Sequence, residues 1–212
     1  MLEARGLSTG YGRARVLYEV SFEARAGEVV ALLGRNGAGK STTLKAMMGL
    51  VPAWSGEVRF DGHRIDRLEP FEVARRGLGY VPEERRIFTD LSVAENLAVG
   101  RQPPRPAGPS WSDERLYALF PALGAMRERR GDRMSGGEQQ MLAIARTLAG
   151  NPKAILLDEP SEGLAPLVVN AVIKAIEELK RAGMTIVLAE QSLRFAERVA
   201  DRVYKVEKGR LA

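Results

Sequence analysis

The chain has 212 residues, of which 45% are hydrophobic and 28% are charged, and its formal net charge is +5. These proportions are typical of a globular protein with a sizeable core, and they exclude the disordered and fibrous classes. The absence of cysteine and the single histidine, His63, exclude a disulfide framework and a structural zinc site made of cysteine and histidine ligands.

The first part of the chain predicts strands around one glycine-rich loop. Leu2 to Leu7 and Val16 to Phe22 have the composition of strands, and the apolar run VVALL within 28–33 is typical of a strand buried on both faces. A loop over 34–39 and a helix from Lys40 to Leu50 come directly afterwards. We therefore expect a strand, a loop and a helix in immediate succession.

A hairpin and a group of helices are expected next. Asp61-Gly62 lies between short alternating runs, which is the pattern of a tight hairpin turn, and a short helix over 71–76 precedes a buried strand over 78–81. Beyond this point the pattern predicts mainly helices.

The predicted helices have recognisable starts and ends. Capping-box spacing, in which a serine is followed three residues later by a glutamate, occurs at 92–95 and again at the start of a helix expected over 135–150. The proline-rich stretch 102–110 is expected to be a loop, and a helix over 113–120 is expected to end at Pro121.

The last part of the chain alternates strands and helices. Strands are expected over 154–157, 184–189 and 202–206, and helices over 167–181 and after Ser192. Repeated strand–helix alternation implies a parallel sheet. We therefore predict an α/β fold with an antiparallel β part and an inserted, mostly helical subdomain.

One segment fits the phosphate-binding pattern G-x-x-x-x-G-K-[ST] between the strand and the helix that this pattern requires. Its backbone N–H groups are expected to surround an anion, Lys40 to reach the β- and γ-phosphates, and Ser41 to bind Mg²⁺. The expected ATP-binding residues are Gly34, Arg35, Asn36, Gly37, Ala38, Gly39, Lys40, Ser41 and the following Thr42.

Two acids follow the apolar strand AILL. Asp158, at the carboxyl end of this strand, is the expected metal partner. Glu159 is expected to polarise an attacking water as the catalytic base. Its alternative interpretation, an acid at a helix start, would leave hydrolysis without an obvious base.

Ser135-Gly136-Gly137-Glu138 begins a predicted helix and would expose free N–H groups to an anion. From helix physics alone the serine is equally well explained as a simple helix cap. Both interpretations remain open on the residues themselves.

The stretches GRNGAGKS, MSGGEQQ and LLDEP, in this order, resemble the ATP-binding cassettes of ABC transporters over essentially the whole chain. The resemblance implies a P-loop NTPase (RecA-like) core within one ABC domain, 1–212. Residues of about 1–84 and 151–212 would form the nucleotide-binding lobe, and about 85–150 the helical subdomain.

The resemblance also implies roles for single residues. Ser135, Gly136, Gly137 and Glu138 would bind the γ-phosphate of ATP held by a second cassette in a head-to-tail dimer. Tyr11 would stack on the adenine.

A narrower resemblance is to the LivF-type subunits of branched-chain amino acid importers. It is carried by YVPEERRIFTDLSVAENLAVG, LLDEPSEGLAP and AEQS. Glu83 stands where most cassettes have glutamine, and is expected to act in catalysis and as a metal ligand. Gln191 stands where most have a histidine that contacts the γ-phosphate, and an amide can supply only a neutral hydrogen bond there.

Taken together, the sequence predicts the ATP- and Mg²⁺-dependent subunit of an amino-acid importer. Its expected partners are a second ATP-binding subunit and a separate transmembrane permease, on the cytoplasmic face of the membrane, because no secretory signal or membrane-spanning run is evident. Binding to nucleic acid is not expected. Two alternatives remain: a soluble ABC-type ATPase acting on nucleic acid or ribosomes, which the basic charge would suit, and an ATP-sensing subunit with little hydrolysis.

Overall fold

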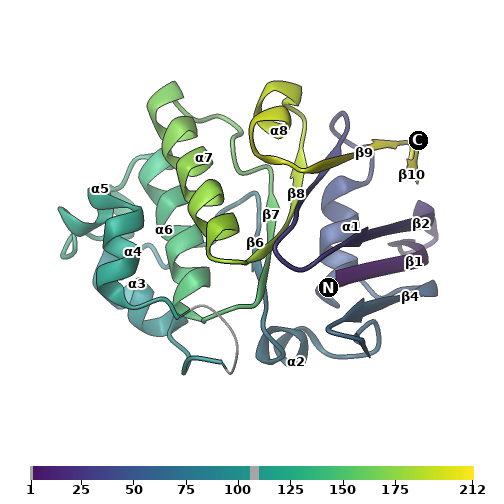
Figure 1. Cartoon of the computed structure of the whole chain (residues 1–212), viewed down its shortest axis with the longest axis horizontal. Coiled ribbons are helices and arrows are strands. Elements are labelled where there is room, and N and C mark those ends of the chain that lie inside the picture. Colours follow the sequence, from purple (N-terminus) through teal and green to yellow (C-terminus); the bar gives the residue numbers. More distant parts are fainter. Residues whose placement is uncertain (1, 106–109) are drawn as a thin grey trace.

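The computed structural model describes residues 2–105 and 110–212, which form two sheets surrounded by helices (Figure 1). A six-stranded sheet has the order β10-β9-β3-β8-β7-β6, and a four-stranded sheet has the order β2-β1-β4-β5. The strands are β1 (Leu2–Tyr11), β2 (Ala14–Ala24), β3 (Val29–Leu33), β4 (Ser55–Phe60), β5 (His63–Arg64), β6 (Leu78–Val81), β7 (Ala154–Asp158), β8 (Thr185–Glu190), β9 (Arg202–Glu207) and β10 (Arg210–Leu211). The helices are α1 (Lys40–Met47), α2 (Pro70–Arg75), α3 (Val93–Gly100), α4 (Asp113–Leu119), α5 (Pro121–Gly124), α6 (Gly136–Ala149), α7 (Pro166–Arg181) and α8 (Leu193–Val199), with a 3₁₀ turn η1 at Gly131–Arg133.

The predicted parallel sheet is confirmed. β3 pairs in parallel with β8 and β9, β7 pairs in parallel with β6 and β8, and only the terminal β10 is antiparallel to its neighbour among the described strands of this sheet. The central strands are apolar throughout because both faces of the sheet are covered.

Each face of the six-stranded sheet faces a different core. In β3, Val29 and Ala31 belong to the core that contains α6, α7 and α8, whereas Val30 and Leu32 belong to the core that contains α1 and the four-stranded sheet. This alternation follows from the two-residue period of a strand. Figure 1 shows α3 to α6 on one side of the molecule and β1, β2 and β4 on the opposite side.

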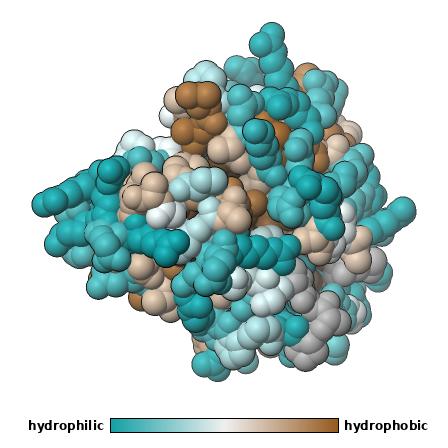
Figure 2. All heavy atoms as spheres, turned by 60° about the vertical axis from the view of Figure 1, so that its left-hand side comes forward, coloured by the Kyte–Doolittle hydropathy of each residue, from teal (hydrophilic) through white to brown (hydrophobic). Residues whose placement is uncertain are grey.

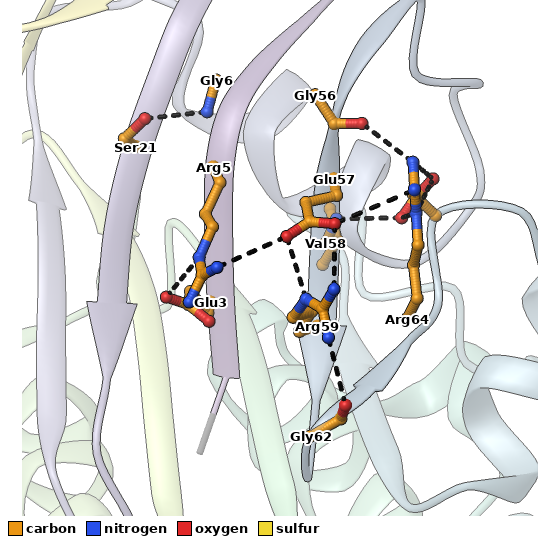
Figure 3. A network of polar contacts seen from close by, with 11 residues as sticks. Glu3, Arg5, Gly6, Ser21, Gly56, Glu57, Val58, Arg59, Gly62 and Arg64 are labelled. Atoms are coloured by element: carbon orange, nitrogen blue, oxygen red, sulfur yellow. Dashed lines mark hydrogen bonds and ion pairs between the residues drawn. The ribbon is translucent and has the colours of Figure 1, made fainter.

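The outer surface of the four-stranded sheet carries a network of charges (Figure 3). The Glu57 carboxylate lies 2.9 Å from Arg59, 3.6 Å from Arg5 and 3.8 Å from Arg64. The hydrogen bond from Arg59 is the main cause that lowers the pKa of Glu57. The pairs with Arg5 and Arg64 join β4 to β1 and β5, but such surface pairs contribute little to stability individually.

Both predicted capping boxes are present. The Ser92 hydroxyl accepts the Glu95 N–H while the Glu95 carboxylate accepts the Ser92 N–H, and Ser135 and Glu138 form the same pair of bonds. Pro121 ends α4 as predicted, but it also begins α5, a short helix that the sequence analysis missed. Proline suits the first position of a helix because its fixed φ is helical and its missing N–H is not needed there.

Several predicted boundaries were wrong. β1 and β2 extend well beyond Leu7 and Phe22, since the two strands form one long hairpin. α1 ends at Met47 rather than Leu50, and Gly49, with a φ of 74°, follows its end. Part of the proline-rich prediction, at 106–109, falls outside the described residues.

The surface on the helical side is mainly hydrophilic, with separate hydrophobic areas (Figure 2). Isolated apolar side chains of this kind are normal on a protein surface. In the ranges that the structure describes, no helix is long and apolar enough to cross a membrane.

The alternation of the two cores predicts the effect of shortening a central strand residue. Leu157 in β7 is completely buried, so Leu157→Ala is expected to lower the free energy of unfolding by about 2–5 kcal/mol through lost burial and a residual cavity. Val203 in β9 is 37% exposed, and Val203→Ala is expected to cost less than about 1 kcal/mol. Urea unfolding of both variants measures the two losses. Equal losses of unfolding free energy would contradict the placement of Leu157 in the core and of Val203 at a partly exposed position.

Candidate functional site

The carboxyl ends of the parallel strands bring most of the predicted site residues together. The loop 34–39 follows β3, Asp158 ends β7 and Glu159 follows it, and Gln191 follows β8. These strands are neighbours in the sheet, and their carboxyl ends meet at one edge. Ligands of open α/β sheets bind in the crevice at this edge.

The glycine loop has the backbone shape of an anion-binding loop. Gly37 and Gly39 have φ values of 77° and 110°, which side-chain-bearing residues rarely adopt. A Cβ on Gly34 would lie 2.4 Å from the Val206 carbonyl oxygen, so this position has no room for a larger residue. α1 begins without a side-chain cap, which leaves N–H groups of its first turn available to an anion.

Lys40 lies at the centre of the site and is only 3% exposed. Its Nζ donates to the carbonyl oxygens of Gly34 (2.9 Å) and Arg35 (3.2 Å). It also forms an ion pair of 2.8 Å with Oε1 of Glu159, whose side chain is 5% exposed. Breaking such a buried pair is costly, because the remaining charge would be left without a partner.

Asp158 has two hydroxyl partners. Ser41 Oγ donates to Oδ1 at 2.8 Å, and the Tyr80 hydroxyl donates to Oδ2 at 3.0 Å. Burial raises the pKa of Asp158, while the hydrogen bonds from Ser41 and Tyr80 act in the opposite direction. Tyr80 was not among the site residues predicted from the sequence, although its place in a strand that ends at the same edge is a usable signal.

The oxygens of Ser41 and Asp158 fit a magnesium ion that is held mainly by phosphates. Mg²⁺ prefers oxygen ligands and is commonly bound through one or two carboxylates together with substrate phosphates and water. A hydroxyl and a carboxylate 2.8 Å apart beside the glycine loop match this donor set. Within the described part of the chain, no cluster of three or more acids and histidines offers an alternative metal site.

Glu159 is held in a strained backbone conformation with a φ of 48°. Its N–H donates to the Ala189 carbonyl at 3.0 Å, and its Oε2 accepts the Gln191 N–H at 3.2 Å. Burial raises the pKa of Glu159, whereas Lys40 lowers it and Glu190 raises it further. A carboxylate with a raised pKa is better able to accept a proton, as a general base must.

Glu190 is a buried residue of the site that the sequence analysis missed. It is 1% exposed; its Oε1 accepts the Ser161 N–H at 3.0 Å, and its Oε2 accepts the N–H groups of Gln191 and Ser192, both at 3.2 Å. It therefore fixes the loops after β7 and β8 to each other. An acid directly after the apolar run TIVLA, like Asp158 after AILL, is the signal that could have found it.

Glu83 lies on the exposed segment after β6, at the same edge of the sheet. Partial burial and the negative charges of Glu162 and Asp158 raise its pKa. Glu83 is therefore near the other acids of the site, although its side chain faces solvent.

The remaining predicted residues lie elsewhere. Ser135 caps α6, which packs in the core opposite to that of α1, and in the described ranges no hydrogen bond or ion pair joins 135–138 to the glycine loop or to Asp158 and Glu159. Tyr11 is 51% exposed at the end of β1.

Comparison with protein families shows what the chain resembles. A family model described as ABC transporter matches residues 17–162. The high-affinity branched-chain amino acid transport ATP-binding protein BraG of Pseudomonas aeruginosa is 44% identical over 211 residues, which cover 100% of this chain and 91% of that protein. The lipopolysaccharide export system ATP-binding protein LptB of Escherichia coli K12 is 38% identical over 212 residues, which cover 99% of this chain and 88% of that protein.

Solved structures agree with the fold. An ATP-binding subunit of an ABC transporter superposes with a TM-score of 0.86 at 32% identity, covering 100% of this chain and 88% of that one. A dimeric ATP-binding cassette in a post-hydrolysis state with ADP and phosphate superposes with a TM-score of 0.84 at 25% identity, covering 100% and 96%. The P-loop core with β and helical subdomains predicted from the sequence is thereby confirmed.

The bonds of Glu190 predict a pH-dependent effect of Glu190→Gln. The variant is expected to lose about 1–3 kcal/mol of unfolding free energy, because an amide nitrogen cannot accept an N–H bond. Burial raises the pKa of Glu190 above its usual 4.5. The contribution of Glu190 to the free energy of unfolding is therefore complete below pH 4.5 and declines as the pH rises through the raised pKa. The loss is therefore expected to be largest at acidic pH.

Urea unfolding of the wild type and the variant, from acidic to neutral pH, measures this difference. Glu177→Gln makes the same change on the exposed face of α7 and is the matched control for the loss of a buried carboxyl group. A loss that grows with pH would show that the pKa of Glu190 is lowered rather than raised.

Proposed function

The chain belongs to the ABC transporter family of ATP-hydrolysing cassettes, and on this premise we propose that it powers an importer of branched-chain or other amino acids. The cluster of Lys40, Ser41, Asp158 and Glu159 beside the glycine loop is the observation that carries the ATPase role. The amino-acid role is supported by the greater identity to BraG than to the lipopolysaccharide export protein. It is also supported by Glu83 and Gln191, the substitutions associated with LivF-type subunits.

The geometry supports a mechanism in which Lys40 changes partners. The N–H groups of 34–42 bind the phosphates of ATP, and the γ-phosphate oxygens compete with Glu159 for the Lys40 ammonium. Once Lys40 binds phosphate, the Glu159 carboxylate is free to accept a proton from the attacking water. Its strained backbone and its bond from the Gln191 N–H hold it at the edge of the site.

Ser41 and Asp158 would hold the Mg²⁺ that accompanies ATP, with Glu83 as an additional oxygen donor. When bound, this ion neutralises charge on the β- and γ-phosphate oxygens. Ser41 would then turn its hydroxyl oxygen from Asp158 to the ion. Tyr80 would continue to orient the Asp158 carboxylate through Oδ2.

The second anion site, Ser135 to Glu138, would serve ATP held by another cassette in a head-to-tail dimer. The separation of this site from the glycine loop within one chain supports that arrangement. Tyr11, exposed at the end of β1, would stack on the adenine. Gln191 would contact the γ-phosphate through a neutral hydrogen bond, which favours slower hydrolysis than a histidine would.

The proposed partners follow from this dimer. Residues 1–84 and 151–212 would act as the nucleotide-binding lobe, and 85–150 as the helical subdomain that contacts a transmembrane permease on the cytoplasmic face of the membrane. ATP favours the closed dimer because closure completes both sites, and hydrolysis removes the bridging γ-phosphate.

The mechanism predicts the behaviour of Glu159→Gln. Phosphate release from Mg-ATP is expected to rise faster than linearly with protein concentration in the wild type, because two chains make each site. Release is expected to fall at least about 100-fold in the variant, which lacks the base but keeps the phosphate loop. A variant that keeps its rate would exclude Glu159 as the base.

The transport role is tested in cells in which the Glu159→Gln variant replaces the wild-type protein. Energy-dependent uptake of leucine, isoleucine and valine is expected to be lost. Normal uptake combined with defective lipopolysaccharide export would contradict the importer assignment.

Tyr80→Phe tests the metal site separately. It removes one of the two donors to Asp158, so the Mg²⁺ concentration for half-maximal phosphate release is expected to rise about tenfold. Tyr204→Phe, which loses a bond with Arg202 on β9, is the control. An unchanged Mg²⁺ requirement in Tyr80→Phe would show that Asp158 is positioned without Tyr80.

A further inference from the structure

An unusual arginine pair lies in the segment that joins β6 to α3. Arg85 and Arg86 both have left-handed backbones, with φ values of 62° and 50°, a conformation that is unfavourable for a residue with a side chain. The turn is fastened to α6, because Arg146 Nη2 donates to the Arg86 carbonyl at 2.7 Å. Consecutive strained residues that are held in place by their surroundings mark functional positions more often than chance.

The Arg85 side chain reaches the N-terminal end of α6. A Cβ placed on Gly136 would lie 2.7 Å from Arg85 Nη1 and 3.4 Å from its Cζ. Cα–Cβ bonds in a helix tilt towards the N-terminus, so the guanidinium lies over the start of the helix. Gly136 therefore leaves the room that this guanidinium occupies.

This cation has no counter-charge. Across residues 2–105 and 110–212, the Arg85 guanidinium forms no hydrogen bond or ion pair, and its Nε is buried. The acids nearby are paired with other arginines: Glu84 lies 3.6 Å from Arg86, and Glu138 lies 3.5 Å from Arg129. A structural arginine would ordinarily have one of these carboxylates as its partner.

The start of α6 adds further unpaired donors. The Ser135 hydroxyl is used by Glu138, and within the described part of the chain the N–H groups of Gly136 and Gly137 have no acceptor. α6 is 14 residues long, so its N-terminus adds partial positive charge. Two free N–H groups and an unpaired guanidinium thus gather at one point.

We propose that Arg85 acts in trans, as a cationic contact to the terminal phosphate of ATP held by the second cassette of the dimer. The inference rests on the proposed function, which brings that phosphate to the start of α6. Arg85 would bind the phosphate by a charge-assisted hydrogen bond, alongside the Gly136 and Gly137 N–H groups. Since Arg85 is two residues after Glu83, one short segment would then contact the nucleotides of both sites.

ATP-driven dimerisation tests the contact without relying on activity. In a Glu159→Gln background, which is expected to retain ATP because it lacks the proposed base, sedimentation in Mg-ATP measures the dimer. Adding Arg85→Ala is expected to weaken this dimer about 10- to 100-fold, with ATP binding to the monomer unchanged. Arg85→Lys is expected to keep part of the affinity.

Arg86→Ala is the matched control, because it removes the same charge from the neighbouring left-handed position, and it is expected to leave the dimer intact. Equal dimerisation with and without Arg85 would overturn the inference and leave the proposed function standing. Failure of the Glu159→Gln chain itself to form an ATP-dependent dimer would overturn both.

Mixing Arg85→Ala with Glu159→Gln, at a protein concentration where each variant alone releases little phosphate, distinguishes action in trans from action in cis. A dimer of one Arg85→Ala chain and one Glu159→Gln chain has one site that combines an intact Glu159 with an intact Arg85 from the other chain. Random pairing is therefore expected to restore about a quarter of the wild-type phosphate release. If Arg85 served only its own chain, no site would be complete, and the absence of recovery would overturn the inference.

Discussion

The buried ion pair between Lys40 and Glu159 is the interaction around which the nucleotide site is organised. It joins the first residue of α1 to the loop after β7, and so connects the phosphate loop to the proposed base. Two backbone carbonyls share the ammonium, which reduces the penalty of burying it. In the proposed mechanism, this contact holds the lysine and the carboxylate together until phosphate oxygens compete for the lysine.

The other buried acids of the site also depend on hydrogen-bond partners. Asp158 is satisfied by two hydroxyl groups and Glu190 by three backbone N–H groups. With Lys40 and Glu159, four ionisable groups are thus buried at one edge of the sheet, each with a partner. Burial raises the pKa of each of the three carboxyl groups. A site of this kind is pre-organised for a bound cation and for proton transfer, and such perturbed groups are typical of active sites.

The proposed second anion site has a different character. Its residues lie at the surface end of α6, where N–H groups and the Arg85 guanidinium have no partner in the described chain. The buried charged groups of the first site all have hydrogen-bond or ion-pair partners within one chain, whereas this one has an unpaired positive charge. That asymmetry gives a physical reason for two cassettes to associate through ATP.

The amino-acid sequence by itself determined the fold class, both capping boxes, and the positions of the glycine loop, Asp158 and Glu159 directly after or at the end of buried strands, because each depends on local spacing or on the apolar run of a single strand. Tertiary structure decided what those residues contact. Tyr80 lies far in sequence from Asp158, Glu190 from Ser161 and Arg85 from Gly136, and only the parallel order of the strands and the packing of α6 bring them together. The full length of the first two strands and the presence of α5 were not predicted, since strand pairing and the dual use of Pro121 are settled by neighbouring elements rather than by local composition.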